Sequence, residues 1–452
     1  MTVQIEVAAG VKLQNLPAHV KQHFINENTF DNPAYAKTKK LGLWTGNIER
    51  FIRLHEAEGD ALMLPRGYFR KVLERLKEEG IPFAFTDRTV CPPATFTNGG
   101  GELYPFQATG LEKLLKAHTG VLEAPTGSGK TNILLSAVPR LQTNTLIIVH
   151  TGELLRQTME RARTWLDIEP GIFGAGKKKI KPLTVAMIQT LAKRDLAEIA
   201  DYFGAVMIDE CHHSPAVTWA RVLQELPAKY KYGFTATAWR KDKLEFLMWR
   251  LISDRHSKVP KSEVVEAGKM VLPEIQVVTT DYWHPIEHPI EWGQMLTDLT
   301  QDPERNDLIE QEVRRRFDGA KVWIIPTALI LTDRIQHANT LSARLSDFSP
   351  VLLTGELTKK DRAAAMEKVR AGAQLTIATT HLLGEGVDVP GWNLLFLASP
   401  IAGGPRTLQA AGRIARPAPG KDRAVLVDFL DEQVPMLKAA FWSRQRLYKK
   451  EE

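Results

Sequence analysis

The stretch Ala124-Pro-Thr-Gly-Ser-Gly-Lys-Thr131 decides the fold class of this 452-residue chain. It follows a short apolar run, 120–123, and precedes a helical pattern, which is the strand–loop–helix context of a phosphate-binding loop. Lys130 would reach the β- and γ-phosphates of a nucleotide, and the Thr131 hydroxyl would ligate Mg²⁺. The alternative is a simple glycine-rich turn, because Ala124 stands where the strict pattern has glycine.

Asp209 and Glu210 end a second apolar run, 205–209. In open α/β folds the carboxyl ends of the strands form the ligand side of the sheet. Asp209 would there hold Mg²⁺ through water, and Glu210 would polarise the attacking water. An acidic strand end in solvent is the alternative, but the phosphate loop upstream favours the catalytic interpretation.

A third segment, Gln409-Ala-Ala-Gly-Arg-Ile-Ala-Arg416, sets Gln409, Arg413 and Arg416 at helical spacing. Arginines that face a γ-phosphate stabilise the charge of the transition state. They could instead be surface arginines of a solvated helix. Gly412 argues against that, because glycine inside a helix costs about 1 kcal/mol without a close approach to justify it.

Short β-branched runs alternate with amphipathic helical stretches from about residue 104 onward, and the alternation restarts near residue 327. This rhythm predicts βαβ units and parallel sheets covered by helices. The expected strands of the two halves are 145–150, 183–188, 205–209 and 233–237, then 327–332, 351–354, 375–379, 394–399 and 424–429.

The first hundred residues lack this rhythm and contain no phosphate loop. Helices are expected over 44–58 and 67–79, with a hinge at 98–101. Lys37, Lys39, Lys40, Arg66 and Arg70 predict a basic surface, with Trp44 and Tyr68 interleaved as stacking platforms or, Trp44 above all, as core.

Bulk composition is that of an ordinary globular protein, with 44% hydrophobic and 25% charged residues and a net charge of +6. Two cysteines cannot form a disulfide framework, and no Cys/His cluster has zinc spacing. Adjacent His212 and His213 lack a third metal ligand nearby. No apolar run is long enough to span a bilayer, so we expect no membrane association and a place in the cytoplasm of a bacterial or phage-infected cell, or at the nucleoid.

Together these motifs resemble those of superfamily 2 helicases and translocases over roughly residues 101 to 440. Thr235-Ala-Thr237 resembles the motif that couples hydrolysis to domain movement, and Tyr104-Pro-Phe-Gln107 resembles the adenine-reading Q motif. The segment 384–390, Gly-Glu-Gly-Val-Asp-Val-Pro, resembles the motif that bridges ATP and nucleic acid. Tyr104 stands where family members often carry arginine.

Within that superfamily the chain is most similar to DExH-type repair and branch-migration helicases, related to the transcription-repair helicase of eukaryotes and to phage recombination helicases. The segments 203–213, 228–237 and 382–386 carry this likeness, including Asp209-Glu-Cys-His212. Ala238 and Lys243 depart from the group, which has proline and often glycine there, and both lie beside the coupling motif.

The resemblance implies ATP and Mg²⁺ as cofactors and assigns roles to residues of this chain. Catalytic roles fall to Lys130, Glu210, Gln409, Arg413 and Arg416. ATP would contact Gln107, Thr126, Gly127, Ser128, Gly129, Lys130, Thr131, Asp209, Gly386 and Asp388, with Thr131 and Asp209 on the metal. Nucleic acid would contact Thr151, Gln189, Thr190, Thr332, Arg334 and Thr380, and coupling would involve His212, Thr235 and Thr237.

The expected fold is α/β, with two tandem RecA-like parallel-sheet domains and a small N-terminal accessory domain. The expected boundaries are 1–100 for a DNA-binding accessory domain, 101–262 and 263–437 for the two RecA-like domains, 283–318 for a linker or insertion, and 438–452 for a basic tail. A basic run, Lys177-Lys-Lys-Ile-Lys181, is expected to be a loop that contacts phosphates or a merely solvated one.

The leading hypothesis is an ATP-dependent DNA helicase or translocase that remodels branched or forked DNA in recombination, repair or replication, with sequence-independent contacts and other replication or recombination proteins as further partners. An RNA helicase and the motor subunit of a restriction or defence system are alternatives. A nucleic-acid-binding scaffold without catalysis would require loss of a residue such as Lys130 or Glu210, and both are present.

Overall fold

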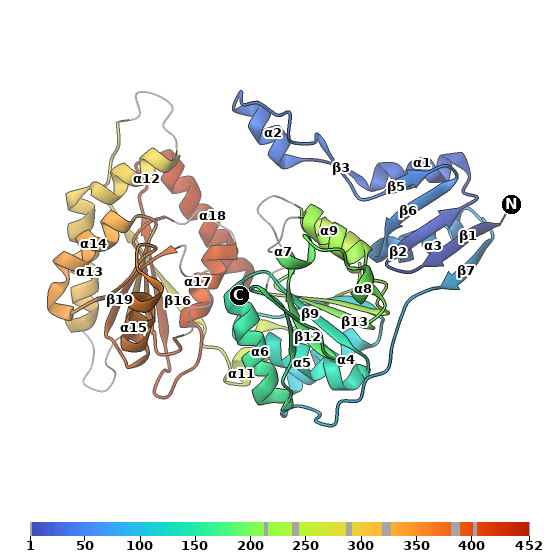
Figure 1. Cartoon of the computed structure of the whole chain (residues 1–452). Helices are drawn as coiled ribbons and strands as arrows, with labels where there is room; N and C mark the ends of the chain where they lie inside the picture. The colour runs from blue at the N-terminus through green and yellow to red at the C-terminus, as the bar shows by residue number, and fades with distance from the viewer. Residues whose placement is uncertain are drawn as a thin grey trace. The chain divides into compact units, whose positions relative to one another are not determined.

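The computed structural model describes residues 2–211, 216–236, 244–285, 292–318, 327–380, 389–400 and 405–451. The chain divides into two compact units (Figure 1). The first unit comprises Met1–Ala124 and Gly129–Val259, and the second comprises Pro125–Ser128 and Pro260–Glu452. The prediction of two α/β parts in tandem is confirmed.

The first unit is built on an eight-stranded sheet whose order is β11-β10-β12-β9-β13-β14-β8-β15. All neighbours pair in parallel except the edge strand β11, which is antiparallel to β10. The central strands are buried along their whole length, as expected of a parallel sheet covered on both faces. The strands are β8 (Thr119–Glu123), β9 (Thr145–Val149), β10 (Gly171–Gly174), β11 (Lys177–Lys179), β12 (Leu183–Met187), β13 (Ala205–Asp209), β14 (Tyr230–Thr235) and β15 (His256–Lys258).

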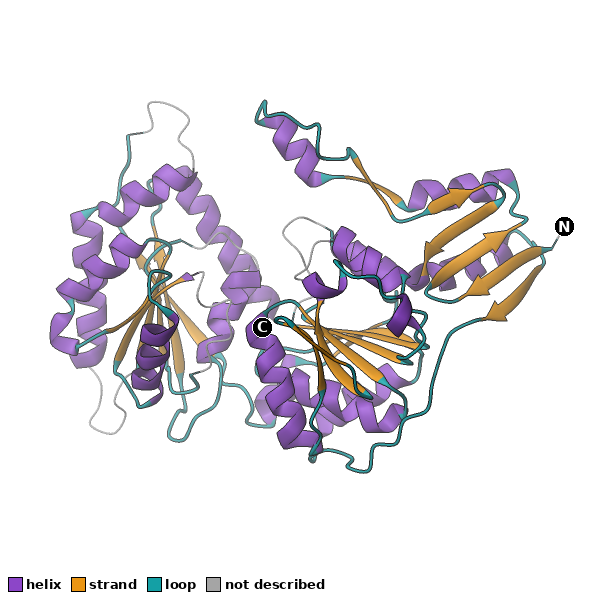
Figure 2. Ribbon diagram, viewed as in Figure 1, coloured by secondary structure: helices purple, strands orange, loops and turns teal. Residues whose placement is uncertain are grey.

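Helices cover this sheet (Figure 2). Helix α6 carries an apolar stripe of Leu155, Met159, Ala162 and Leu166 at the spacing of one helical face. The helices are α4 (Pro105–Leu115), α5 (Lys130–Leu141), α6 (Gly152–Leu166), α7 (Ile188–Leu191), α8 (Ala197–Ala200), α9 (Ala216–Gln224) and α10 (Glu245–Leu251).

The N-terminal module is a mixed five-stranded sheet of order β5-β6-β2-β1-β7 with two helices. In β1 the side chains alternate between buried and exposed, the pattern of a strand with one face on a core. The elements are β1 (Val3–Val7), β2 (Gly10–Gln14), α1 (Ala18–Glu27), β5 (Glu56–Glu58), β6 (Ala61–Pro65), a 3₁₀ turn (Arg66–Tyr68), α3 (Phe69–Glu78) and β7 (Phe83–Asp87). The predicted helix over 67–79 is confirmed.

The helix expected over 44–58 is wrong. That segment contains strands β4 (Phe51–Arg53) and β5 instead. Ile52 and Leu54 alternate inward and are buried in the core of the large sheet, so long-range packing overrides local helical preference. The expectations for the two aromatics are also reversed: Tyr68 is buried and Trp44 is exposed.

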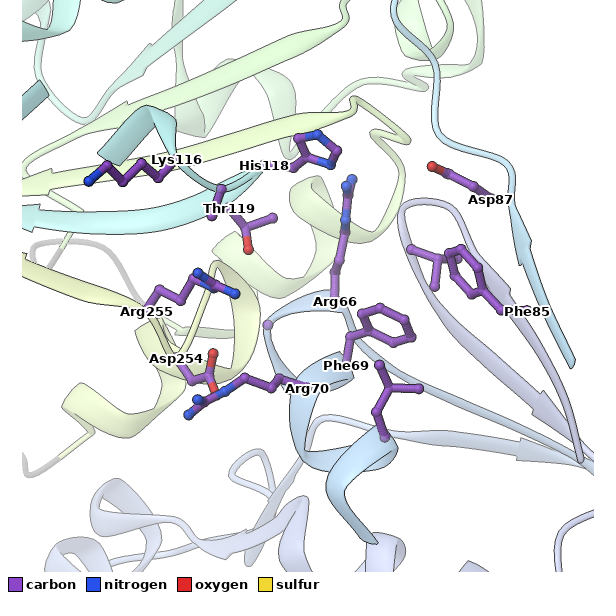
Figure 3. A pocket seen from close by; sticks show the side chains of 14 residues that line it. Arg66, Phe69, Arg70, Phe85, Asp87, Lys116, His118, Thr119, Asp254 and Arg255 are labelled. Atoms are coloured by element: carbon purple, nitrogen blue, oxygen red, sulfur yellow. The ribbon is translucent and has the colours of Figure 1, made fainter. Parts of the chain in front are cut away.

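Two buried cations fasten the N-terminal module to the large sheet. The Arg66 guanidinium donates to the carbonyls of Ala228 and Lys229, and the Lys231 ammonium donates to the carbonyls of Ala9 and Leu223 at 2.8 Å. Beside them Arg70 pairs with Asp254 at 2.6 Å, on the wall of a hollow of about 390 Å³ (Figure 3). Arg66 and Arg70 therefore stabilise the contact between the N-terminal module and the domain of the large sheet. Arg66 is buried and is not part of the predicted basic surface.

The second unit is built on a fully parallel six-stranded sheet of order β16-β21-β20-β17-β19-β18. Its strands are β16 (Pro273–Thr279), β17 (Ala328–Thr332), β18 (Val351–Leu353), β19 (Leu375–Thr379), β20 (Leu394–Leu397) and β21 (Ala424–Leu430). Its helices are α11 (Lys261–Glu266), α12 (Trp292–Gln301), α13 (Pro303–Asp318), α14 (Ile335–Arg344), α15 (Lys359–Arg370), α17 (Pro405–Ile414) and α18 (Pro435–Glu451).

Two segments of the second unit, predicted as a linker or insertion and as a basic tail, contain helices that pack into the core. The predicted insertion, 283–318, contains α12 and α13, whose Leu299 and Ile309 are buried. The predicted basic tail, 438–452, lies largely in α18, where Arg444 and Tyr448 are buried. Both segments contribute to the core of this unit.

The nine strands predicted for the two sheets all exist, with ends that differ by at most a few residues. The basic run at 177–181 is different from its prediction, because its first three lysines form edge strand β11 rather than a loop. In the part of the chain that the structure describes, no helix is long and apolar enough to span a bilayer.

Candidate nucleotide site

The phosphate loop joins strand β8 to helix α5, both of which belong to the first unit. Gly127 and Gly129 adopt left-handed backbone angles, with φ of 89° and 76°, which side-chain-bearing residues rarely adopt. Gly129 caps α5, which begins at Lys130. The free N–H groups at a helix start favour bound phosphate.

Gly129 also allows close approach by a predicted nucleotide contact. A Cβ atom on Gly129 would lie 2.4 Å from Nε2 of Gln107, so the Gln107 side chain occupies the space beside the loop. Gln107 is buried, and its Oε1 accepts the N–H of Tyr104 at 3.0 Å in a capping box at the start of α4. Tyr104 is 40% exposed and stacks on Phe106. Contact of Gln107 with a base remains a prediction.

Lys130 lies against the acidic strand end. Its Nζ is 3.4 Å from Oε1 of Glu210 and 3.4 Å from the carbonyl of Ala124. Both charged side chains are mostly buried, with 10% and 20% exposure. The structure thus brings together the predicted phosphate-binding lysine and the predicted general base.

Asp209 completes this cluster at the end of β13. Burial and the negative charge of Glu210 raise its pKa to about 7, although Lys130 opposes both. Lys130 therefore faces both carboxylates. Carboxylates placed together in this way suit a bound divalent cation, which would add positive charge to the site.

The backbone at Glu210 is left-handed, with φ of 49°. A side-chain-bearing residue in this region costs roughly 1–2 kcal/mol. The Glu210 N–H donates to Oδ1 of Asp209 at 3.0 Å, and the next N–H, of Cys211, donates to the carbonyl of Phe234. These contacts hold the turn that directs the Glu210 carboxylate toward Lys130. Strain of this kind is characteristic of functional sites.

Thr235 ends β14, the strand next to β13 in the sheet. It is buried, and its carbonyl accepts the N–H of Ala124 at the start of the phosphate loop. The predicted coupling residue is therefore bonded directly to the loop through the backbone. The other two predicted coupling residues, His212 and Thr237, lie outside the described residues.

In the second unit, Gln409 and Arg413 lie in α17, and Arg416 lies just past its end. Burial lowers the pKa of Arg416. Its carbonyl accepts from Lys421, whose ammonium also donates to the carbonyl of Pro390. The two other predicted nucleotide residues of this unit, Gly386 and Asp388, lie outside the described residues.

Lys421 is a site residue that the sequence motifs did not indicate. Lys421 lies outside every motif in the sequence. In the structure its ammonium donates to the carbonyls of Arg416 and Pro390, so it connects the arginine segment with the end of the 384–390 motif. Glu123 ends β8 next to the loop but serves the fold, because it pairs with His256 at 3.0 Å and Lys258 at 3.4 Å.

The predicted nucleic-acid residues of the first unit lie at neighbouring strand ends, because β9 and β12 pair directly. Thr151 caps α6 by accepting the N–H of Leu154, and Gln189 donates to the carbonyl of His150 at 2.7 Å. Thr190 follows in α7. Thr151 thus has the ordinary role of a helix N-cap.

The corresponding residues of the second unit are also brought together. Thr332 and Thr380 are buried, and the Thr380 hydroxyl donates to the Thr332 carbonyl at 3.0 Å. The Thr332 hydroxyl bonds His337 and Ser399. Arg334 caps the start of α14 and donates to the carbonyl of Gly293 in α12. Only Arg334 of the three is partly exposed in the described structure.

Comparison with known proteins identifies both units. Residues 100–240 match the family described as "Type III restriction enzyme, res subunit", and residues 321–418 match "Helicase conserved C-terminal domain". The chain belongs to the superfamily 2 helicases. That superfamily comprises nucleic-acid-dependent ATPases.

Individual relatives agree with this assignment. A Rad25 DNA 3′-5′ helicase homologue of Halobacterium salinarum is 28% identical over 70% of this chain and 52% of the relative, so the chain spans about half the length of that protein. Helicase D10 of Escherichia phage T5 is 26% identical over 69% of this chain and 68% of the relative. Among solved structures, S. cerevisiae Dbp5 bound to RNA and ADP BeF3 superposes with a TM-score of 0.53 at 15% identity, covering 77% of this chain and 88% of that one, which shows a shared fold.

Proposed function

We propose that this helicase hydrolyses ATP to move along DNA and to remodel forked or branched DNA. The observation that carries the proposal is the cluster of Lys130, Asp209 and Glu210 beside a glycine-rich loop in the left-handed conformation. It contains the cation for phosphate, a carboxylate suited to Mg²⁺, and a general base in one buried place.

The donor set suits Mg²⁺ and a nucleotide. Thr131 offers a hydroxyl and Asp209 a carboxylate, which are oxygen ligands of the kind that Mg²⁺ prefers. Mg²⁺ would neutralise charge that develops on the phosphates. Lys130 then binds phosphate oxygens and leaves Glu210, so that Glu210 can accept a proton from water. Arg413 and Arg416 would add positive charge at the γ-phosphate, an effect of roughly 10³–10⁵ in rate where measured.

Coupling to movement would pass through the backbone between Thr235 and Ala124. This bond connects the loop that senses phosphate with the strand that leads toward α10. Thr151, Gln189, Arg334 and their neighbours would hold one strand by its phosphates, which predicts sequence-independent and salt-sensitive binding.

DNA is the proposed substrate because the relatives named above are a DNA 3′-5′ helicase homologue and a phage helicase. A specific observation also favours a second candidate, the motor of a restriction or defence system. The first unit matches a family described by the res subunit of Type III restriction enzymes.

Steady-state ATP hydrolysis tests the proposal. The protein would be assayed alone and with single-stranded, duplex and forked DNA, and with RNA, and Lys130→Ala serves as the inactive control. Strongest stimulation by forked DNA, absent in the control, supports remodelling. Stimulation by RNA alone would replace DNA with RNA as the substrate, and equal stimulation by any duplex would favour a restriction-type translocase.

A further inference from the structure

A two-stranded ribbon in the N-terminal module carries a helix away from the body of the first unit (Figure 1). We call residues 29–54 the arm. It begins with β3 (Thr29–Asp31), continues through α2 (Pro33–Lys40) and a loop, and returns along β4, which is antiparallel to β3. The sequence predicts a basic surface here, with Lys37, Lys39, Lys40 and Trp44 among its residues.

The base of the arm is fixed to the motor domain. The Phe30 ring packs against Phe246 of α10, with ring centroids 4.2 Å apart and ring planes tilted by 37°, and Ile52 and Leu54 are buried in the core that also contains Leu247. Helix α10 follows Thr235, the predicted coupling residue, along the chain. The arm is therefore anchored on the element that comes after the nucleotide-sensing strand.

The tip of the arm exposes apolar side chains. Helix α2 has no buried residue, and the chain after it turns through Gly42 with φ of 66°. Leu41, Leu43 and Trp44 are 59%, 61% and 75% exposed. Trp44 is thus the most exposed large hydrophobic side chain among the residues that the structure describes.

The tip is nevertheless locally ordered. The Asn32 side chain accepts the N–H of Ala34 at the start of α2, and its amide donates to the carbonyl of Glu49 in the loop just before β4. The Trp44 indole lies over Gly46, since a Cβ atom there would be 2.2 Å from it. The arm therefore presents an indole from a closed loop, which lowers the entropic cost of using it as a contact.

The charge around this indole is positive. Residues 31–53 contain Lys37, Lys39, Lys40, Arg50 and Arg53 against Asp31 and Glu49, which gives a net charge of +3. All three lysines are exposed. Cations beside an exposed aromatic ring suit a nucleic acid, because the cations hold phosphates and the ring stacks on a base.

We propose that the arm binds the junction between duplex and single strand, with Trp44 stacked on the last base pair and the lysines of α2 on the adjoining phosphates. The proposal rests on the proposed function and names the part of the substrate that this helicase selects. A protein partner is a weaker fit, because a stable interface buries about 800 Å² on each side and the apolar part of the tip comprises three side chains on a segment with a net charge of +3.

Forked DNA that carries 2-aminopurine in the first base pair of the duplex tests the proposal directly. Trp44→Ala should bind the fork about tenfold more weakly than the wild type, and the change in 2-aminopurine fluorescence on binding should disappear. Replacing Lys37, Lys39 and Lys40 with alanine should weaken binding and lower the slope of log K against log salt by about 2. Trp283→Ala is the matched control, because Trp283 is 63% exposed and lies in the second unit; it should bind like the wild type.

Other results would overturn the proposal. Wild-type affinity and an unchanged fluorescence signal in Trp44→Ala, with thermal melting showing a folded protein, would remove the junction contact. A dimer of the wild type that becomes a monomer in Trp44→Ala would assign the tip to a second copy of the chain. Failure of the proposed function is distinct, since wild-type protein would then hydrolyse no ATP on any DNA.

Discussion

Buried carboxylates stand at strand ends in both α/β units, but their surroundings differ. In the second unit Asp428, near the end of β21, and Asp431, just after it, each face one arginine through two hydrogen bonds. In the first unit Asp209 and Glu210 share Lys130. In the second unit each aspartate has its own arginine, whereas in the first unit two neighbouring carboxylates face the same lysine and the charge of one raises the pKa of the other.

The pairs of the second unit are complete. Arg444 donates to Asp428 at 2.7 and 2.9 Å, and both side chains are 1% exposed. Arg305 donates to Asp431 at 2.7 and 3.3 Å and to the Ala398 carbonyl. Pairs of this geometry join β21 to α18 and to α13. The comparison therefore separates a carboxylate that holds the fold from one that is available for chemistry.

The largest effect that would test this distinction is on catalysis. Glu210→Gln should lower the rate of ATP hydrolysis by roughly 10²–10⁴, the usual contribution of a general base. Folding stability should be unchanged or higher, because the substitution removes one of two negative charges that face Lys130. Hydrolysis assays and thermal melting on the same samples measure both effects.

Glu123→Gln is the matched control for that experiment. Glu123 ends β8 at the same edge of the sheet, yet it is paired with His256 and Lys258. Its replacement should cost stability and leave most of the hydrolysis rate. A similar loss of rate in the two variants would show that proximity to the loop, not charge balance, determines which carboxylate is catalytic.

The next effect is on the stability of the second unit. Asp428→Asn leaves the Arg444 guanidinium buried without a counter-charge, a change that typically costs about 3–5 kcal/mol of unfolding free energy. Urea denaturation of the purified protein measures it. Replacing both residues, Asp428→Leu with Arg444→Met, should recover much of the loss. If the double replacement were as unstable as Asp428→Asn, packing of α18 rather than charge would carry the stability.

Sequence patterns predicted the parts of this molecule that depend on local periodicity. Strands such as 205–209 and 375–379 were predicted to the residue, because a fully buried parallel strand is a continuous apolar run between turn signals. The phosphate loop and Asp209-Glu210 could also be predicted from the sequence, since their chemistry requires those residue types at the ends of strands.

The patterns could not predict features that depend on contacts between distant residues. Nothing local distinguishes Ile52 and Leu54 from the apolar positions of a helix, and they become strand residues because the large sheet offers them a core. Arg66 was expected at a surface and serves instead as a buried clamp on carbonyls about 160 residues away. The partners of Lys421 and Glu123 likewise exist only in the folded chain.

A smaller effect concerns His337, which is buried in the second unit between Thr332 and Asn306. Burial, with a further contribution from Arg305, lowers its pKa to about 3 from 6.5. The unfolded chain therefore takes up a proton below pH 6.5 that the folded chain does not. Stability should fall by about 2 kcal/mol from this group between pH 6.5 and pH 5.

Denaturation at several pH values measures this dependence, and His337→Gln is the comparison. The variant should be less stable at neutral pH but should lose less stability on acidification. Parallel pH curves for the two proteins would show that His337 does not titrate in this way.

The smallest predicted effect concerns the ionisation of Asp209 and its consequence for the affinity for Mg²⁺. Because its pKa is raised to about 7, its carboxylate is about 90% ionised at pH 8 and about 10% at pH 6. Only the ionised form can ligate Mg²⁺, so the affinity for Mg²⁺ should fall about tenfold over that interval, as a titration with a fluorescent ATP analogue would show. Burial is the main cause of this raised pKa and the charge of Glu210 is the second, so Glu210→Gln should lower the pKa and its Mg²⁺ affinity should begin to fall only at lower pH. If the wild type and Glu210→Gln lost Mg²⁺ affinity over the same pH range, the two carboxylates would be independent, and repulsion between them could not be what distinguishes this site from the paired aspartates of the second unit.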